Sequence, residues 1–216
     1  MSVYRLSSAL LSYPEAELLA ALPELLSFAE QADCGAELAP LFDYLQSQDL
    51  IALQEHYVAT FDRTPSLSLH LFEHVHGESR DRGQAMVDLL AEYQALGYEP
   101  EGYELPDFIP LFLEFLSVHD ELKSQALLDD AIHVMAAIGQ RLAQKENPYA
   151  CVLLNLTRYT EVVPRQMHEP PVRDMDDALE TFGPGADGVE PLLKPQAGQD
   201  VIRFYRRGET SAAPLR

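Results

Sequence analysis

Tryptophan is absent from this 216-residue chain, and cysteine occurs only twice, as Cys34 and Cys151. The two cysteines stand far apart in the sequence and lack the paired spacing of zinc sites or thiol-exchange motifs. We therefore expect two buried free thiols, as in a protein of a reducing compartment, with a single disulfide as the alternative.

Positive charge is also scarce, because 15 lysines and arginines stand against 35 aspartates and glutamates, a formal net charge of −20. Phosphate backbones and anionic membranes bind clustered lysine and arginine, so this balance argues against nucleic-acid and phosphoinositide partners. Residues 6–62 and 83–122 contain no lysine or arginine at all. These two stretches predict a negative field over part of the surface, which favours a partly basic partner.

Long apolar runs are missing as well, and no stretch approaches the ~18–20 continuous apolar residues of a membrane-spanning helix. The apolar run near the N-terminus is short and leads into Pro14-Glu15 instead of a small-residue cleavage site, so no signal peptide is expected. We expect a cytoplasmic protein with no direct membrane insertion.

Helical periodicity extends over most of the first 160 residues. One predicted helix face has apolar residues at intervals of three and four: Leu128, Ala131, Met135, Ile138 and Leu142. No alternating strand pattern and no Asn-Gly hairpin signal occurs before residue 160. The predicted fold class is all-α, a single-domain helical bundle over residues 1–160.

Several helix boundaries are marked by capping residues, glycine or proline. Asp49 is expected to cap a helix, and Asp81 with Gln84 three positions later resembles a capping box that starts another. Gly97 is expected to end that second helix. Pro23 is expected to kink or divide the helix around it.

The composition changes in residues 161–216, which hold seven of the fifteen prolines and five of the eleven glycines. Helical periodicity is weak there, so we expect an extended, weakly structured C-terminal tail, loosely docked or mobile. Its last part is basic, with Arg203, Arg206, Arg207 and Arg216 against only Asp200 and Glu209. This cluster could fold back on the acidic body or reach an acidic surface of a partner.

One segment concentrates polar chemistry around three histidines, His70, His74 and His76. If residues 67–76 form a helix, His70 and His74 share a face and Glu73 lies beside them. His70-x-x-Glu73-His74 then matches the pattern of inverted zinc proteases, although no third ligand is identified. A zinc-dependent hydrolase is the less favoured alternative. A structural alternative is that these side chains bond to neighbouring helices and hold a helix–loop–helix corner.

Three stretches of the chain carry a family resemblance. They are Tyr57-Val-x-x-Phe61-Asp62, residues 69–86 (LHLFEHVHGESRDRGQAM) and residues 105–115 (LPDFIPLFLEF). Together with the LLSYP sequence at residues 10–14 they extend over about residues 4–160. In these stretches the chain resembles the NarJ-type chaperones that assemble respiratory nitrate reductase, within the wider TorD-like group of redox-enzyme maturation proteins.

The resemblance implies an all-helical cytoplasmic chaperone with no catalytic activity and no cofactor of its own. Such chaperones bind the N-terminal segment of the apo catalytic (alpha) subunit of nitrate reductase. They support insertion of the molybdenum bis-guanine-dinucleotide cofactor before membrane attachment. The leader of that subunit is apolar with basic residues, which suits an apolar groove in a negative field.

The resemblance also suggests partner-binding residues. Four apolar or aromatic residues are expected to line the groove or pack beneath it, with core packing as the alternative: Tyr57, Phe61, Phe72 and Val75. Four polar residues are candidates for contacts with the client: Glu73, His74, His76 and Glu78. Arg80 and Arg82 contact the client or pair with local acids such as Asp81 and Glu78. Asp107 is expected in the first turn of a helix that forms one groove wall or simply a core helix, and Pro110 requires that helix to begin late or to kink.

Overall fold

The computed structural model describes residues 1–76, 80–100, 104–119, 121–165 and 167. Almost all of the predicted tail therefore lies outside the described residues. Within them the chain is helical and contains no strand, which confirms the predicted all-α class. The elements, in which η1 is a π-helix and η2 and η3 are 3-10 helices, are α1 Val3–Leu11, α2 Ala16–Gln31, α3 Gly35–Ser47, α4 Leu50–Tyr57, η1 Val58–Asp62, η2 Pro65–Leu67, α5 Leu71–His76, α6 Arg80–Ala95, α7 Ile109–Ser117, α8 Glu121–Gln144, α9 Ala150–Asn155 and η3 Leu156–Tyr159.

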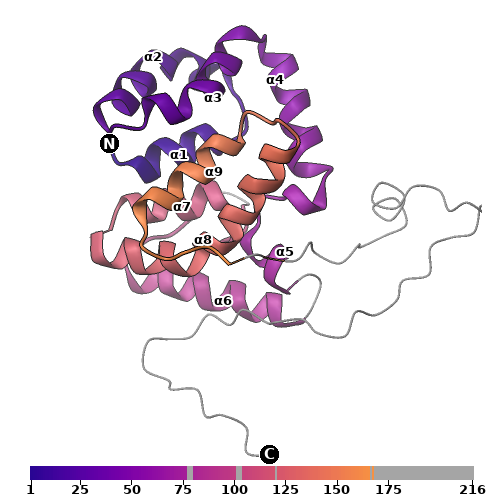
Figure 1. The fold of residues 1–216 in the computed structure, drawn as a ribbon. Helices are drawn as coiled ribbons and strands as arrows, with labels where there is room; N and C mark the ends of the chain where they lie inside the picture. Colours follow the sequence, from indigo (N-terminus) through magenta and orange to yellow (C-terminus); the bar gives the residue numbers. More distant parts are fainter. Residues whose placement is uncertain (77–79, 101–103, 120, 166, 168–216) are drawn as a thin grey trace, which may run out of the picture.

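The helices pack around one hydrophobic core, to which α8 contributes a long buried face (Figure 1). The largest helix contacts join α1 to α7 and α8 to α9, and α2 packs on α3. The apolar face predicted for α8 is confirmed, because its members are at most 2% exposed: Leu128, Ala131, Met135, Ile138 and Leu142. The short helix α5 and the amphipathic helix α6 lie at the lower edge of this bundle in Figure 1.

Two of the predicted helix boundaries are confirmed. The Asp49 carboxylate accepts a hydrogen bond from the backbone N–H of Ala52 at 2.9 Å, as an N-cap does. Gly97 follows α6 with φ +78°, a left-handed conformation that glycine adopts without strain.

The predicted capping box is wrong, and of the two outcomes expected at Pro23, a kink or a division, the division does not occur. Asp81 lies inside the first turn of α6, and the Gln84 side chain donates to Asp88 instead of reaching back. Pro23 lies within the unbroken helix α2. Its side chain is exposed, so water can solvate the carbonyl that loses its helical hydrogen bond.

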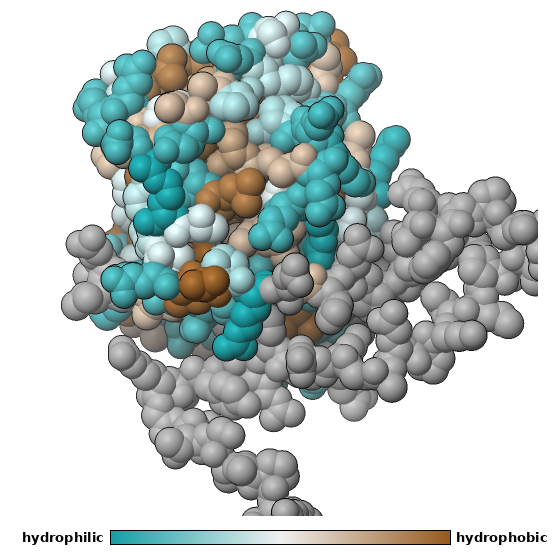
Figure 2. Space-filling model, in the orientation of Figure 1, coloured by the Kyte–Doolittle hydropathy of each residue, from teal (hydrophilic) through white to brown (hydrophobic). Residues whose placement is uncertain are grey.

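Both cysteines are free thiols, as expected, with Cys34 buried and Cys151 half-buried. Burial raises the pKa of the Cys151 thiol to about 11, so this thiol is protonated and poorly reactive at neutral pH. Among the described residues, none of the helices combines the length and the apolar character needed to cross a membrane. The face drawn in Figure 2 is mostly hydrophilic, with small hydrophobic areas near its centre.

Candidate functional site

The histidine-rich segment forms a corner between two parts of the chain that are far apart in sequence. The helix considered over residues 67–76 does not form in its first half, because α5 begins only at Leu71. Residues 69–71 instead run antiparallel to residues 107–109, which lead into α7. The Leu71 N–H donates to the Asp107 carbonyl at 3.0 Å, and the Ile109 N–H donates to the Leu69 carbonyl at 2.8 Å. This pairing uses backbone groups that a longer α5 would have kept for itself.

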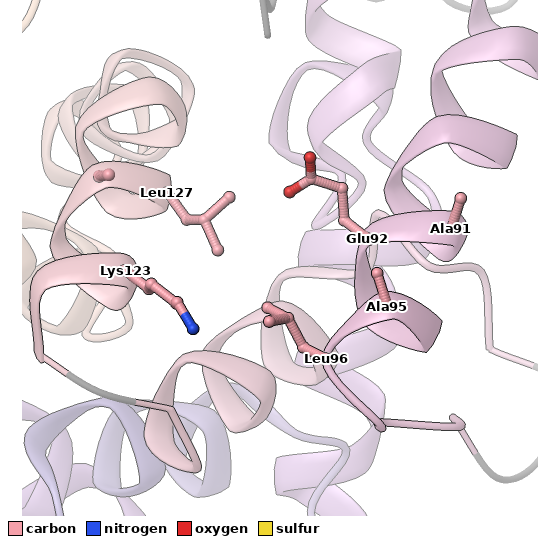
Figure 3. Close-up of a pocket in the computed structure, with 7 residues that line it drawn as sticks. Ala91, Glu92, Ala95, Leu96, Lys123 and Leu127 are labelled. Carbon is pink, nitrogen blue, oxygen red and sulfur yellow. The ribbon is translucent and has the colours of Figure 1, made fainter. Parts of the chain in front are cut away.

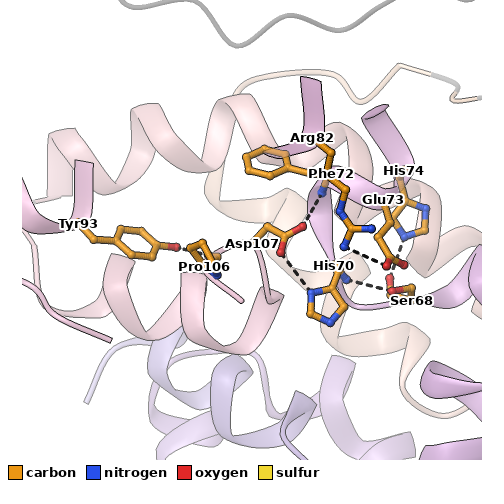
Figure 4. Close-up of polar contacts among 9 residues, drawn as sticks. All are labelled: Ser68, His70, Phe72, Glu73, His74, Arg82, Tyr93, Pro106 and Asp107. Carbon is orange, nitrogen blue, oxygen red and sulfur yellow. Dashed lines mark hydrogen bonds and ion pairs between the residues drawn. The ribbon is translucent and has the colours of Figure 1, made fainter. Parts of the chain in front are cut away.

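Asp107 is the centre of this corner (Figure 4). Its side chain is fully buried, and one carboxylate oxygen accepts the Phe72 N–H at 3.1 Å while the other lies 3.2 Å from His70 Nδ1. The prediction that Asp107 lies in the first turn of its own helix is wrong, because α7 begins after it at Ile109. Asp107 instead caps α5, 35 residues earlier in the chain. The late start of α7 is the arrangement that Pro110 was expected to require.

His70 pairs with a buried carboxylate. Burial alone would lower the pKa of His70, but the hydrogen bond and the charge of Asp107, with the charge of Glu73, outweigh it and raise this pKa. Protonated His70 therefore strengthens the contact with Asp107. The pair fixes the approach to α5 onto the start of α7.

The other polar side chains of the corner also bond within the protein. Glu73 forms an ion pair with Arg82 of α6 at 3.1 Å, and both side chains are largely buried. Arg82 thus pairs with a local carboxylate, as the sequence suggested, and its partner among the described residues is Glu73. His74 Nε2 donates to the Ser68 carbonyl at 2.8 Å, and Arg141 of α8 lies 3.4 Å from His74 Nδ1.

In these contacts each residue of the zinc pattern is bound to a different partner. His70 faces Asp107, Glu73 faces Arg82, and His74 faces Ser68 and Arg141. Over the described part of the chain, no group of three histidine, cysteine, aspartate or glutamate side chains is placed to hold a metal ion. The geometry favours the structural alternative, in which these side chains hold a helix corner.

The remaining predicted site residues occupy different environments. Phe72 is 5% exposed, whereas Val75 and His76 of the same helix are half-buried. Burial lowers the pKa of His76, and Asp81 opposes this only in part, so His76 is mainly neutral at pH 7. Glu78 lies outside the described residues, and Arg80 is described only as the first residue of α6.

Tyr57 belongs to another cluster, inside the core. Its hydroxyl donates to the Leu11 carbonyl at 2.9 Å, and its ring packs edge-on against Phe61 and Tyr149. This placement matches the core-packing alternative for Tyr57 and Phe61. A role for either residue in contacting a client stays a prediction.

Sequence reasoning missed three residues that hold the corner together. The Tyr93 hydroxyl of α6 donates to the Pro106 carbonyl at 2.7 Å, directly before Asp107. Arg141 donates to the Ser66 carbonyl at 3.1 Å and thereby ties α8 to the approach of α5. Arg141 had one sequence signal, a single arginine in an otherwise mainly apolar stretch of helix. Ser66 had none.

Comparison with known proteins decides the family. The profile described as "Nitrate reductase delta subunit" matches residues 28–155, which include the whole α5 corner. The chain belongs to this family. Membership in the nitrate reductase delta subunit family confirms the NarJ-type resemblance expected from the sequence.

Three relatives of the delta subunit family illustrate the similarity. The chain is 42% identical over 154 residues to the nitrate reductase molybdenum cofactor assembly chaperone NarJ of Escherichia coli K12, covering 69% of this chain and 65% of the relative. It is 38% identical over 149 residues to the probable chaperone NarW of the same strain, covering 69% and 64%. It is 30% identical over 149 residues to the probable chaperone NarJ of Bacillus subtilis 168, covering 68% and 81%. The matched region thus spans just under two thirds of each E. coli relative.

Proposed function

We propose that this protein is an assembly chaperone of respiratory nitrate reductase. It binds the N-terminal segment of the apo catalytic (alpha) subunit in the cytoplasm and supports insertion of the molybdenum cofactor before membrane attachment. The observation that carries the proposal is the 42% identity, over 154 residues, to a protein named as a nitrate reductase molybdenum cofactor assembly chaperone. The family profile extends over most of the described helices, so the likeness includes the scaffold and the corner together.

The chemistry of the corner supports binding and not catalysis. Its acids and histidines bond to backbone groups, to each other and to Arg82, which is typical of side chains with a structural role. A general base needs an electron pair directed at a proton of the substrate, and a metal ligand needs one directed at the metal ion. The zinc-hydrolase alternative therefore has no support from the arrangement of His70, Glu73 and His74.

The surface charge supports a basic client segment. Residues 6–62 carry ten carboxylates and no lysine or arginine, and they form much of α1 to α4. An apolar segment with basic residues gains from such a field both in its rate of association and in its orientation. Within the corner, the half-buried Val75 and His76 are the residues we assign to contact with the client, because they can touch a ligand without unfolding α5. Phe72 and Asp107 position them.

Co-expression with the catalytic subunit tests this proposal. A tagged full-length chain should capture the subunit, and removal of the first ~15–20 residues of the subunit should abolish capture, because a groove ligand supplies most of the contact. Val75→Asp should weaken capture at least several-fold. Val118→Asp is the matched control, because Val118 follows α7 and is 53% exposed.

Two results would contradict the proposal. Capture that is unchanged when the N-terminal segment is removed would show that the client is recognised elsewhere. Failure to capture the subunit under any condition, with both proteins folded, would remove the chaperone function itself.

A further inference from the structure

A cleft of about 380 Å³ separates α6 from the first half of α8. Figure 3 shows Glu92 and Leu96 of α6 facing Lys123 and Leu127 of α8 across it. Most of the lining is apolar and comes from alanine and leucine side chains of both helices: Ala91, Ala95, Leu96, Ala126 and Leu127. Three of these side chains, the alanines, are exposed, so the cleft is an open surface onto which another chain segment can pack.

The α6–α8 cleft is open because α6 is attached to the body along one side only. Tyr93 is the one buried residue of α6 among those the structure describes, and its ring centroid lies 4.2 Å from that of Phe115 on α7. Its hydroxyl is bound to the Pro106 carbonyl. The side of α6 that carries Ala91, Glu92 and Ala95 is exposed and faces α8 across the cleft.

The two charged residues that line the cleft are Glu92 on α6 and Lys123 on α8, and the edge on the side of Glu92 is negatively charged. Glu92 lies close enough to Asp130 of α8 for its charge to act there. Partial burial, the charge of Asp129 and the charge of Glu92 together raise the pKa of Asp130. In the described part of the chain, no lysine or arginine forms an ion pair with Glu92 or Asp130. An occupant with apolar and cationic side chains would bury the apolar lining and relieve this repulsion.

The chain itself contains a segment of this composition. Residues 201–207, which lie outside the described residues, have the sequence VIRFYRR, with four apolar or aromatic residues and three arginines. The arginines are part of the basic cluster of the tail, whereas residues 83–122 contain no positive residue. The segment is therefore complementary to the apolar lining of the cleft and to its acidic edge at Glu92 and Asp130, whereas Lys123 lies on the opposite wall.

The last described residues also contact α8, one of the two helices that form the cleft. The Thr160 hydroxyl bonds to Asp129, and the Arg165 N–H donates to His133 of α8 at 3.1 Å. From His133 back to Leu127 is about 9 Å along the helix axis at about 1.5 Å per residue. A connection of roughly 34 residues, as between positions 167 and 201, is long enough to span this distance, since even a helical chain advances about 1.5 Å per residue.

We propose that residues 201–207 of the chain's own C-terminal tail bind in the α6–α8 cleft. The apolar side chains of the segment cover Leu96 and Leu127, and its arginines face Glu92 and Asp130. Because the tail is tethered, its effective concentration at the cleft is of millimolar order, and modest contacts suffice to hold it. The tail then competes with any apolar, basic segment of a partner for this cleft. That last consequence rests on the proposed function.

Site-specific photo-crosslinking in the full-length chain tests the docking. A benzophenone amino acid is placed at position 204 in place of Phe204, and crosslinked peptides are mapped by mass spectrometry. We expect crosslinks within one chain to peptides that contain residues 91–96 and 123–127. The same probe at Phe182, a tail position without neighbouring arginines, is the matched control and should not select these peptides. A mixture of isotope-labelled and unlabelled chains separates crosslinks within a chain from those between chains.

Charge reversal in the cleft gives a second, independent readout. Glu92→Lys combined with Asp130→Lys should lower the yield of the position-204 crosslink at least five-fold, while circular dichroism shows unchanged helix content. A yield unaffected by this double change would overturn the proposal, as would crosslinks that map to other helices. Crosslinks found only between chains would assign the cleft to a second copy and would also overturn it.

A peptide that copies the client leader tests the competition separately. Loss of the position-204 crosslink on adding this peptide supports competition. A peptide that binds the chain but leaves the crosslink unchanged overturns competition and not the docking of the tail. A peptide that does not bind at all counts against the proposed function, whatever the crosslinks show.

Discussion

Removal of the Asp107 carboxylate should unfold the corner first and should destabilise the whole bundle. Asp107→Ala leaves the Phe72 N–H without its acceptor and removes the anionic partner of His70. Loss of one partner from a buried charged contact costs about 3–5 kcal/mol, and loss of an N-cap costs about 0.5–2 kcal/mol. The two costs overlap, because the same carboxylate makes both contacts, so we expect the free energy of unfolding to fall by about 3–4 kcal/mol.

Asp107→Asn removes the negative charge of the side chain but keeps its size and shape. The amide oxygen of asparagine can still accept the Phe72 N–H, so the cap is kept and only the attraction to protonated His70 is lost. We expect a smaller loss, about 1–2 kcal/mol, typical of one hydrogen bond to a charged group. Asp88→Asn is the matched control, because it removes the same charge from an exposed position of α6 and should change stability by less than about 0.5 kcal/mol.

The pH dependence follows from the raised pKa of His70. A group whose pKa is higher in the folded state stabilises the fold fully below its unfolded value, about 6.5 for histidine. This contribution is lost as the pH rises through the folded value. The coupling between Asp107→Asn and His70→Ala in a double-mutant cycle should therefore be large at about pH 5.5 and small well above neutrality, at about pH 8.5.

Urea denaturation followed by circular dichroism measures all four variants and their double mutant. A loss below about 1 kcal/mol for Asp107→Ala would refute the capping role. A coupling that grows with pH, or does not change, would refute the assignment of His70 as the titrating partner.

Three further predictions concern packing, the ion pair and metal. Gly139→Ala should destabilise the protein by about 1 kcal/mol, because its new Cβ would lie 3.1 Å from the Leu154 side chain. Gly83→Ala meets nothing within 4 Å and should stabilise α6 by up to about 1 kcal/mol; thermal melts measure both changes. Arg82→Ala should cost about 1–3 kcal/mol in urea titrations, with partial recovery when Glu73 is changed to Gln as well. Elemental analysis of purified full-length chain should find far less than one zinc per chain; stoichiometric zinc lost in His70→Ala and His74→Ala would contradict the corner as described.

The elements that the sequence predicted well depend on local chemistry. The apolar face of α8 follows from intervals of three and four, and the cap by Asp49 needs only a carboxylate next to a helix start. The turn at Gly97 needs only a residue that tolerates positive φ. Each of these signals lies within a few residues of the feature it predicts.

The errors occur where distant segments meet. Asp107 caps a helix that begins 36 residues before it, so no pattern around Asp107 could identify that helix. The spacing of His70 and His74 fits one helical turn, but the backbone of His70 pairs with Phe108 instead. Here a tertiary contact outweighed local periodicity. The resemblance to the NarJ-type family indicated the segment but not which of its side chains bond to which, and the client-binding role of these residues stays a prediction.

The most direct test of the central claim is the molybdenum content of the nitrate reductase catalytic subunit, measured by mass spectrometry after production with and without this chain. The account predicts cofactor-loaded subunit when the full-length chain is present and mostly apo subunit when it is absent. Loading should also fail when the chain is present but the N-terminal segment of the subunit is removed. Equal molybdenum content with and without the chain would contradict the claim that it is an assembly chaperone.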